Sequence, residues 1–194
     1  MTTFVLATAN PHKTLEMAAI LEGLGITVLP RPSEVPDVDE TEETLEGNAL
    51  LKARALVAAT GHAAVADDTG LFVDALDGRP GVYSARYAGE HASYEDNVTK
   101  LLGEMSGVAA EQRTARFRSV IAVAYPDGTS LVVDGVLEGV VTQAARGTEG
   151  FGYDPVFAPT ELGGRTLAEL TPTEKNAVSH RARALLALGA ALSS

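Results

Sequence analysis

The chain of 194 residues contains no cysteine. This absence excludes disulfide bonds, thiolate nucleophiles and structural zinc sites of the usual kind. No apolar run is long enough to cross a bilayer, and the first four residues lack the basic region of a signal peptide. We therefore expect a cytoplasmic protein with no membrane partner.

Positive charge is also scarce. The sequence has 15 Lys and Arg residues against 26 Asp and Glu residues, which gives a formal net charge of −11, and no dense basic run. Such a surface repels nucleic acid and anionic membranes, so we expect no nucleic-acid partner. A small anionic substrate would need local positive charge or a metal ion to overcome this field.

The order of expected elements indicates an α/β fold, and the length fits one domain, residues 1–194, with two lobes. Residues 4–9 read as a buried strand, Asn10 can cap a helix that begins at Pro11 and ends at Gly25, and residues 26–29 read as a second strand. The remaining expected elements are a loop over residues 31–47, a helix over 45–59, two short strands within 64–76, a loop over 79–91, a helix over 93–106, a hairpin of 115–125 and 129–141, a glycine-rich loop over 146–154, and helices in the C-terminal third.

The pair Asp67-Asp68 is the most informative candidate for chemistry. The small apolar residues 63–66 read as a buried strand, and Gly70 reads as a chain reversal. Two carboxylates at the mouth of a strand suit a hard cation such as magnesium. The alternative is a pair of turn aspartates that cap their own backbone.

The segment from Thr8 to Lys13 joins a strand end to a helix N-terminus, where N–H groups and the helix dipole favour a phosphate. It is not a Walker loop, because Gly-Lys occurs nowhere in the chain. The alternative is plain capping by Asn10 with a solvated Lys13.

An acidic loop carries Glu40, Glu42 and Glu43 ahead of the expected helix that contains Lys52. One of these carboxylates could join Asp68 on a metal ion while Lys52 reaches a phosphate. The alternative is a surface loop whose charge favours the helix N-terminus. The sequence leaves open which glutamate would be the ligand.

Two C-terminal segments could meet a nucleotide. The run from Gly150 to Pro155 offers glycines for close approach and aromatic faces for base stacking, unless it is a tight turn with core aromatics. Lys175 and His180 point apart on one continuous helix, so both could meet one ligand only if the helix breaks near Ser179. The alternative is a single amphipathic helix with a solvated basic face.

Taken together, these segments resemble the Ham1/inosine triphosphate pyrophosphatase family. The motifs that carry the resemblance come in family order and span nearly the whole chain. They are Thr8-Ala9-Asn10-x-x-Lys13-x-x-Glu16, Asn48-Ala49-x-x-Lys52-Ala53, Ala66-Asp67-Asp68-Thr69-Gly70-Leu71, Pro80-Gly81-Val82-Tyr83-Ser84-Ala85-Arg86-Tyr87, Gly150-Phe151-Gly152-Tyr153-Asp154-Pro155 and Ser179-His180-Arg181.

The resemblance implies a mixed twisted sheet with flanking helices, two lobes around a central cleft, and a homodimer. It implies hydrolysis of non-canonical purine nucleoside triphosphates with Mg²⁺, with Asp68 as proton acceptor. The implied metal ligands are Glu40 and Asp68, and we add Asp67 as a second carboxylate. The implied substrate-binding residues are Thr8, Ala9, Asn10, Pro11, His12, Lys13, Lys52, Thr69, Phe151, Gly152, Tyr153, Asp154, Lys175, His180 and Arg181.

The chain departs from the family pattern at two places. Many members carry serine where Thr69 stands, and the hydroxyl is kept. An aromatic residue and a glutamate are common directly before Asn48, where this chain has Glu46-Gly47. The competing functions are a pyrophosphatase for other modified nucleotides, pyrimidines included, and a nucleotide sensor that does not turn over.

Overall fold

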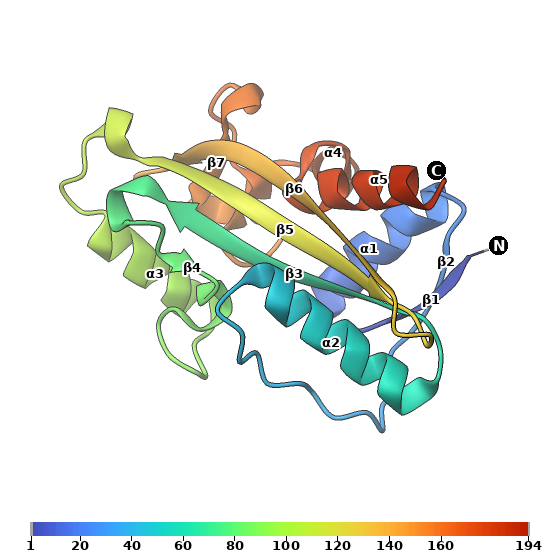
Figure 1. The fold of residues 1–194 in the computed structure, drawn as a ribbon. Coiled ribbons are helices and arrows are strands. Elements are labelled where there is room, and N and C mark those ends of the chain that lie inside the picture. The colour runs from blue at the N-terminus through green and yellow to red at the C-terminus, as the bar shows by residue number, and fades with distance from the viewer. Residues whose placement is uncertain (1, 194) are drawn as a thin grey trace. The chain divides into compact units, whose positions relative to one another are not determined.

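The computed structural model describes residues 2–193, and Figure 1 shows the order of their elements. The strands are β1 (Thr3–Leu6), β2 (Thr27–Leu29), β3 (Ala64–Val73), β4 (Pro80–Gly81), β5 (Thr114–Ala124), β6 (Ser130–Val141) and β7 (Phe157–Pro159). The α-helices are α1 (Pro11–Gly23), α2 (Leu45–Thr60), α3 (Tyr94–Glu104), α4 (Pro172–Val178) and α5 (His180–Leu192). Short 3-10 helices lie at Asp74–Leu76, Ser84–Arg86, Ala110–Gln112, Asp154–Val156, Thr160–Leu162 and Leu167–Glu169.

The strands form a mixed sheet in the order β2-β1-β3-β5-β6-β7, with β4 paired to β3. Strand β1 runs parallel to both β2 and β3, whereas β3 with β4 and β6 with β7 are antiparallel. The predicted mixed sheet with helices is therefore confirmed. The predicted hairpin of β5 and β6 is confirmed as well, and the Tyr125 N–H donates to the Thr129 carbonyl across its turn at 3.0 Å.

The chain divides into two compact units. The first contains the residues up to Asp68, Ser119–Gly135 and the residues from His180 on, and the second contains Thr69–Arg118 and Val136–Ser179. Each unit has its own apolar core. The first core consists of Phe4, Leu6, Met17, Leu21, Ile26, Val65, Ile121, Val123, Ala184, Leu185 and Leu188. The second consists of Leu71, Val73, Leu76, Leu101, Met105, Ala115, Phe117, Leu137, Val141, Tyr153, Val156, Phe157, Leu167 and Leu170.

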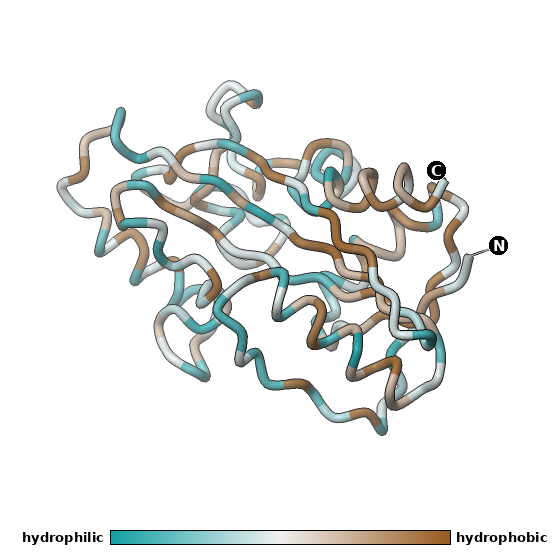
Figure 2. The backbone as a smooth tube through the Cα atoms, in the orientation of Figure 1, coloured by the Kyte–Doolittle hydropathy of each residue, from teal (hydrophilic) through white to brown (hydrophobic). Residues whose placement is uncertain are grey.

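Helix α1 forms as its sequence predicts. Asn10 caps it, Pro11 takes the first position, and the helix buries Met17 and Leu21. Its neighbour is α5, which packs against it in the first unit (Figure 1). Figure 2 shows hydrophobic and hydrophilic stretches alternating along α2, as expected for a helix that buries one face.

The prediction of two short strands around Asp67-Asp68 is wrong. Strand β3 continues through both aspartates and Gly70 to Val73. Gly70 does not reverse the chain. A Cβ at this position would lie 2.5 Å from the Gly81 carbonyl oxygen, so glycine allows the backbone of β4 to approach closely.

The C-terminal helix breaks near Ser179, which was one of the two alternatives that the sequence left open. Helix α4 begins after Thr171, which forms a capping box with Glu174, and it ends at Val178. Ser179 has an extended backbone with ψ 157°, and α5 begins at His180. Among the helices within residues 2–193, none combines the length and the apolar character that a membrane span requires.

Candidate functional site

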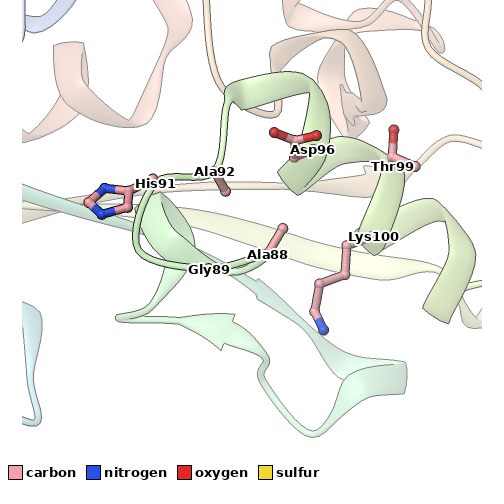
Figure 3. Close-up of a pocket in the computed structure, with 7 residues that line it drawn as sticks. All are labelled: Ala88, Gly89, His91, Ala92, Asp96, Thr99 and Lys100. Atoms are coloured by element: carbon pink, nitrogen blue, oxygen red, sulfur yellow. The ribbon is translucent and has the colours of Figure 1, made fainter.

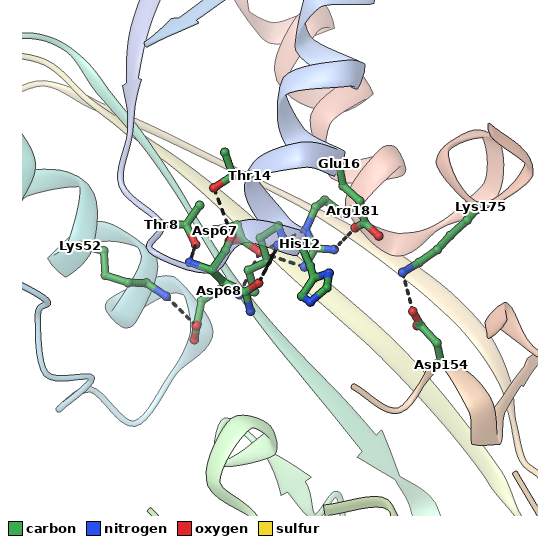
Figure 4. A network of polar contacts seen from close by, with 12 residues as sticks. Thr8, His12, Thr14, Glu16, Lys52, Asp67, Asp68, Asp154, Lys175 and Arg181 are labelled. Carbon is green, nitrogen blue, oxygen red and sulfur yellow. Dashed lines mark hydrogen bonds and ion pairs between the residues drawn. The ribbon is translucent and has the colours of Figure 1, made fainter. Parts of the chain in front are cut away.

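Asp68 of β3, Lys52 of α2 and Glu40 of the preceding loop form a compact cluster in the first unit. The Lys52 ammonium donates to Asp68 Oδ1 at 2.8 Å and to Glu40 Oε1 at 3.0 Å. Figure 4 shows Lys52 pointing toward Asp68. One cation thus holds two carboxylates together, whereas the sequence suggested that the carboxylates could share a metal ion while Lys52 reaches a phosphate.

Asp68 is electrostatically unusual. Burial raises the pKa of its carboxyl to about 6, and the negative charge of Glu40 adds to the rise, while the Lys52 ammonium opposes it. Its Oδ2 atom is buried and has no hydrogen-bond partner among the described residues. A buried carboxylate oxygen without a partner is costly, and such groups often mark a place for a ligand or reacting group.

Asn48 resolves which glutamate of the loop approaches the cluster. Its side-chain oxygen accepts a hydrogen bond from the Glu42 N–H at 3.0 Å, which ties the loop to the first turns of α2. Glycine at position 47 allows close contact with Glu42, because a Cβ there would lie 2.7 Å from the Glu42 Cβ. With Glu42 held in this way, Glu40 is the loop glutamate that reaches Lys52.

Asp67 faces a different set of partners. Its Oδ2 lies 3.2 Å from the Lys13 ammonium and 3.1 Å from the Arg181 guanidinium. Burial by itself raises the pKa of Asp67, but the charges of Lys13 and Arg181 outweigh it and keep the pKa well below its usual range. Arg181 also pairs with Glu16 and is only 1% exposed. Asp67 as a metal ligand stays a prediction, since two cations occupy its described contacts.

The predicted phosphate-binding segment forms a tight cap. The Asn10 side chain accepts from the N–H groups of His12 and Lys13 at 3.0 and 3.3 Å, and the Asn10 N–H donates to Thr8 Oγ1 at 3.2 Å. Asn10 therefore does cap the helix, and a phosphate at this helix end would share N–H groups with it. A cavity of about 710 Å³ adjoins the segment. It is lined by Thr8, Ala9, Pro11, Thr14, Leu15, Pro30, Arg31, Pro32, Ser33, Val35, Pro36 and Asp37.

The second unit holds a buried ion pair beside an aromatic ring. Lys175 of α4 donates to Asp154 Oδ2 at 2.5 Å (Figure 4). Its ammonium lies 4.6 Å from the centre of the Phe151 ring. The Phe151 N–H also donates to Asp154 Oδ2, at 2.8 Å. Gly150 is required here, because a Cβ would lie 2.1 Å from the same oxygen. The turn thus presents an aromatic ring, a cation and a carboxylate together.

Tyr153 has a role that its sequence position did not reveal. Its ring is buried in the core of the second unit, and its hydroxyl donates to the Ser84 carbonyl at 2.9 Å. Burial raises the pKa of this hydroxyl, which keeps it a neutral donor. Direct contact of Tyr153 with a substrate would therefore involve its backbone. Gly152, the preceding residue, has a φ of 64° that suits glycine.

Three further predicted residues lie at or next to the points in the sequence where one unit ends and the other begins, after Asp68 and after Ser179. Thr69 follows Asp68 on β3 and is half-buried. His180 and Arg181 begin α5, and both are buried. Their contacts with a nucleotide stay predictions. A separate cavity of about 530 Å³ contains none of the predicted site residues (Figure 3). It is lined by Ala88, Gly89, His91, Ala92, Asp96, Thr99 and Lys100.

The carboxylates of Glu40 and Asp68 suit a magnesium ion that keeps other ligands. Within residues 2–193 no group of three or more His, Cys, Asp or Glu side chains is arranged to hold a metal by itself. Mg²⁺ usually binds one or two protein carboxylates and takes its remaining oxygen ligands from water and substrate phosphates. Two carboxylates with one buried, unpartnered Asp68 oxygen fit that donor set.

Comparison with known proteins gives one consistent answer. The family model described as "Ham1 family" matches residues 4–191. A "dITP/XTP pyrophosphatase" of Geobacter sulfurreducens is 53% identical over 97% of this chain and 95% of its own length, and one of Symbiobacterium thermophilum is 50% identical over 93% and 90%. A solved HAM1 protein from Coxiella burnetii matches with a TM-score of 0.89 and 41% identity over 100% of this chain and 99% of its own. The chain belongs to the Ham1 family.

Proposed function

We propose that this chain is an acid-anhydride hydrolase that converts ITP, dITP, XTP and dXTP to the monophosphate and pyrophosphate, and so removes non-canonical purines from the nucleotide pool of the cytoplasm. The near full-length relatives named dITP/XTP pyrophosphatases support this reaction. The observation that carries the proposal is the Asp68 carboxylate, which is buried, has a raised pKa and is joined through Lys52 to Glu40 of the acidic loop.

Glu40 and Asp68 are the residues that would hold Mg²⁺. When bound, the ion would lower the pKa of a coordinated water and neutralise charge that develops on the leaving pyrophosphate. The number of metal ions is left open, because Asp67 is already paired with Lys13 and Arg181.

The remaining chemistry belongs to the side chains of the first unit. Asp68 orients the attacking water or takes its proton, and a pKa near 6 makes it a better base than an ordinary aspartate. Water attacks the α-phosphorus, and pyrophosphate leaves. Lys13 and Lys52 provide positive charge against the triphosphate, which lets a protein of net charge −11 hold a strongly anionic ligand.

The purine base of the substrate would bind at the turn of residues 150–155 in the second unit. Hypoxanthine and xanthine present O6 as an acceptor and N1–H as a donor. Lys175 can donate to O6, and Asp154 can accept from N1–H, while the Phe151 ring offers a stacking face. Adenine reverses both polarities and would leave buried groups unpaired, which discriminates strongly. Guanine shares this edge, so its exclusion needs a further contact with the 2-amino group.

The test is pyrophosphate release by the purified chain with Mg²⁺ on a panel of triphosphates. The proposal expects fast turnover of ITP, dITP and XTP and slow turnover of ATP and GTP. Equal rates on all purines would remove the proposed base selectivity. Faster turnover of dUTP or dTTP would favour the pyrimidine alternative, and nucleotide binding without pyrophosphate release would favour a sensor.

We also propose a homodimer. Tyr83 is 56% exposed, and the Arg86 guanidinium lies 5.3 Å from the centre of its ring, which gives the surface of the second unit a large apolar group with a cationic partner. Aromatic residues and arginine are enriched in protein interfaces. Light scattering after size exclusion tests this, with Tyr83→Asp expected to shift the population toward monomer.

A further inference from the structure

The Lys52 ammonium lies between the two carboxylates to which the proposed function assigns the divalent cation. Its ammonium bridges Glu40 Oε1 and Asp68 Oδ1 at 3.0 and 2.8 Å, and these are the two carboxylates that fit magnesium. The lysine therefore supplies the positive charge that holds both carboxylates in place.

Lysine and metal ion cannot share this space. A Mg²⁺ ion lies about 2.1 Å from each carboxylate oxygen that binds it, so it would come within van der Waals distance of an ammonium hydrogen-bonded to the same two oxygens. The side chains of Lys52 and Asp68 are 14% and 6% exposed, so water screens the repulsion between the two cations poorly. An ion on Glu40 Oε1 and Asp68 Oδ1 would therefore displace Lys52 from at least one of these oxygens.

We propose that Lys52 and the divalent cation compete for the space between Glu40 and Asp68, and that the incoming cation releases Lys52 to bind the triphosphate. The inference rests on the proposed function, which assigns the two carboxylates to the metal. It makes Lys52 a residue with two successive partners, first the carboxylates of Glu40 and Asp68 and then the substrate.

Two consequences follow. The protein alone should bind divalent cations weakly, because binding must break at least one of the two contacts of Lys52. A triphosphate gives the released ammonium a new anionic partner, so nucleotide and metal should strengthen each other's binding by the same factor. The flexible four-carbon side chain of lysine allows this exchange without movement of helix α2.

The test measures Mn²⁺ binding by electron paramagnetic resonance in protein stripped of metal and free of nucleotide. Lys52→Met is compared with Lys13→Met, which removes the same charge from the first unit but pairs with Asp67 rather than with Glu40 or Asp68. We expect Lys52→Met to bind Mn²⁺ at least about tenfold more tightly than the wild type, and Lys13→Met to change the affinity much less. We also expect Lys52→Met to lose most of the gain in Mn²⁺ affinity that a non-hydrolysable ITP analogue gives the wild type.

If Lys52→Met binds Mn²⁺ no more tightly than Lys13→Met does, the proposed competition between Lys52 and the cation is wrong. A second measurement needs no variant and so does not depend on its folding. In crystals of the wild type with Mn²⁺ and no nucleotide, the Lys52 ammonium should have left at least one of the two carboxylates, whereas retention of both contacts beside the bound ion contradicts the proposal. Wild-type turnover of ITP, measured separately, tests the proposed function itself, so the two failures can be told apart.

Discussion

Asp67 and Asp68 are adjacent in β3, yet their carboxylates are held by different helices. Asp67 pairs with Lys13 of α1 and Arg181 of α5, whereas Asp68 pairs with Lys52 of α2. This division follows from the strand itself, because successive side chains point to opposite faces. Asp67 is therefore paired with two cations, whereas Asp68 shares the single cation of Lys52 with Glu40.

The different surroundings predict opposite effects for two matched substitutions. Asp68→Asn should lower kcat on ITP by about 10²–10⁴-fold, because it removes the group that accepts the proton of the attacking water. It should leave the fold intact. Asp67→Asn should destabilise the fold by roughly 3 kcal/mol, because Lys13 and Arg181 both lose a buried carboxylate, although Arg181 keeps its ion pair with Glu16. Turnover and denaturant unfolding measured on both variants check this. Near-normal turnover by Asp68→Asn would show that Asp68 is not the proton acceptor.

Asp68 also predicts a pH dependence of stability in the metal-free protein. Its pKa is raised from 3.8 to about 6 in the folded state, so the folded protein holds this proton more tightly than the unfolded chain. The contribution of this group is fully present below pH 3.8 and is lost as the pH rises through about 6. We expect the free energy of unfolding of the wild type, relative to Asp68→Asn, to fall between pH 4.5 and 7.5 in EDTA. A difference that is constant over this range would contradict the raised pKa.

Asp154 should control which purine base the enzyme accepts. Asp154→Asn replaces an acceptor-only carboxylate with an amide that can also donate, and it leaves Lys175 buried beside a neutral group. We expect the ratio of kcat/KM for ITP over ATP to fall by about 10–100-fold. Glu174→Gln is a suitable control, because Glu174 caps α4, the helix that carries Lys175, but is exposed. An unchanged ratio in Asp154→Asn would exclude it from base recognition.

Tyr153 offers a test of the turn that carries Phe151 and Asp154. Tyr153→Phe removes the donor to the Ser84 carbonyl and should destabilise the protein by about 1–3 kcal/mol, because a buried carbonyl loses its partner. Tyr83→Phe is the matched control, since Tyr83 is exposed, and it should change stability by less than about 0.5 kcal/mol. Equal unfolding free energies for the two variants would contradict the role given to Tyr153.

Local signals in the sequence predicted the elements that local contacts build. Asn10 and Pro11 marked the start of α1, and Ser179 marked the break between α4 and α5, because capping depends on residues within one turn. The sequence suggested that Lys52 and Asp68 could serve one site, but it did not predict the ion pair between them. The two-lobed cleft and the homodimer stay predictions.

Long-range contacts account for what the sequence did not reveal. Arg181 meets Asp67 across 114 positions of the chain, and Tyr153 meets Ser84 across 69. No periodicity or spacing marks such pairs. The choice of Glu40 over its neighbours depended on Asn48, whose side chain binds the loop backbone rather than another side chain. Gly70 was misinterpreted for the same reason, because a strand glycine and a turn glycine look alike in sequence.

Gly70 gives a final prediction with an internal control. A Cβ at Gly70 would lie 2.5 Å from the Gly81 carbonyl oxygen and 3.0 Å from its carbonyl carbon, so Gly70→Ala must push β4 away from β3. We expect a loss of about 1–3 kcal/mol in the free energy of unfolding. A Cβ at Gly23, the last residue of α1, would meet nothing within 4 Å, so Gly23→Ala should leave stability unchanged or raise it by up to about 1 kcal/mol. Chemical denaturation of both variants decides the matter, since equal stabilities would mean that β3 and β4 do not approach as closely as described.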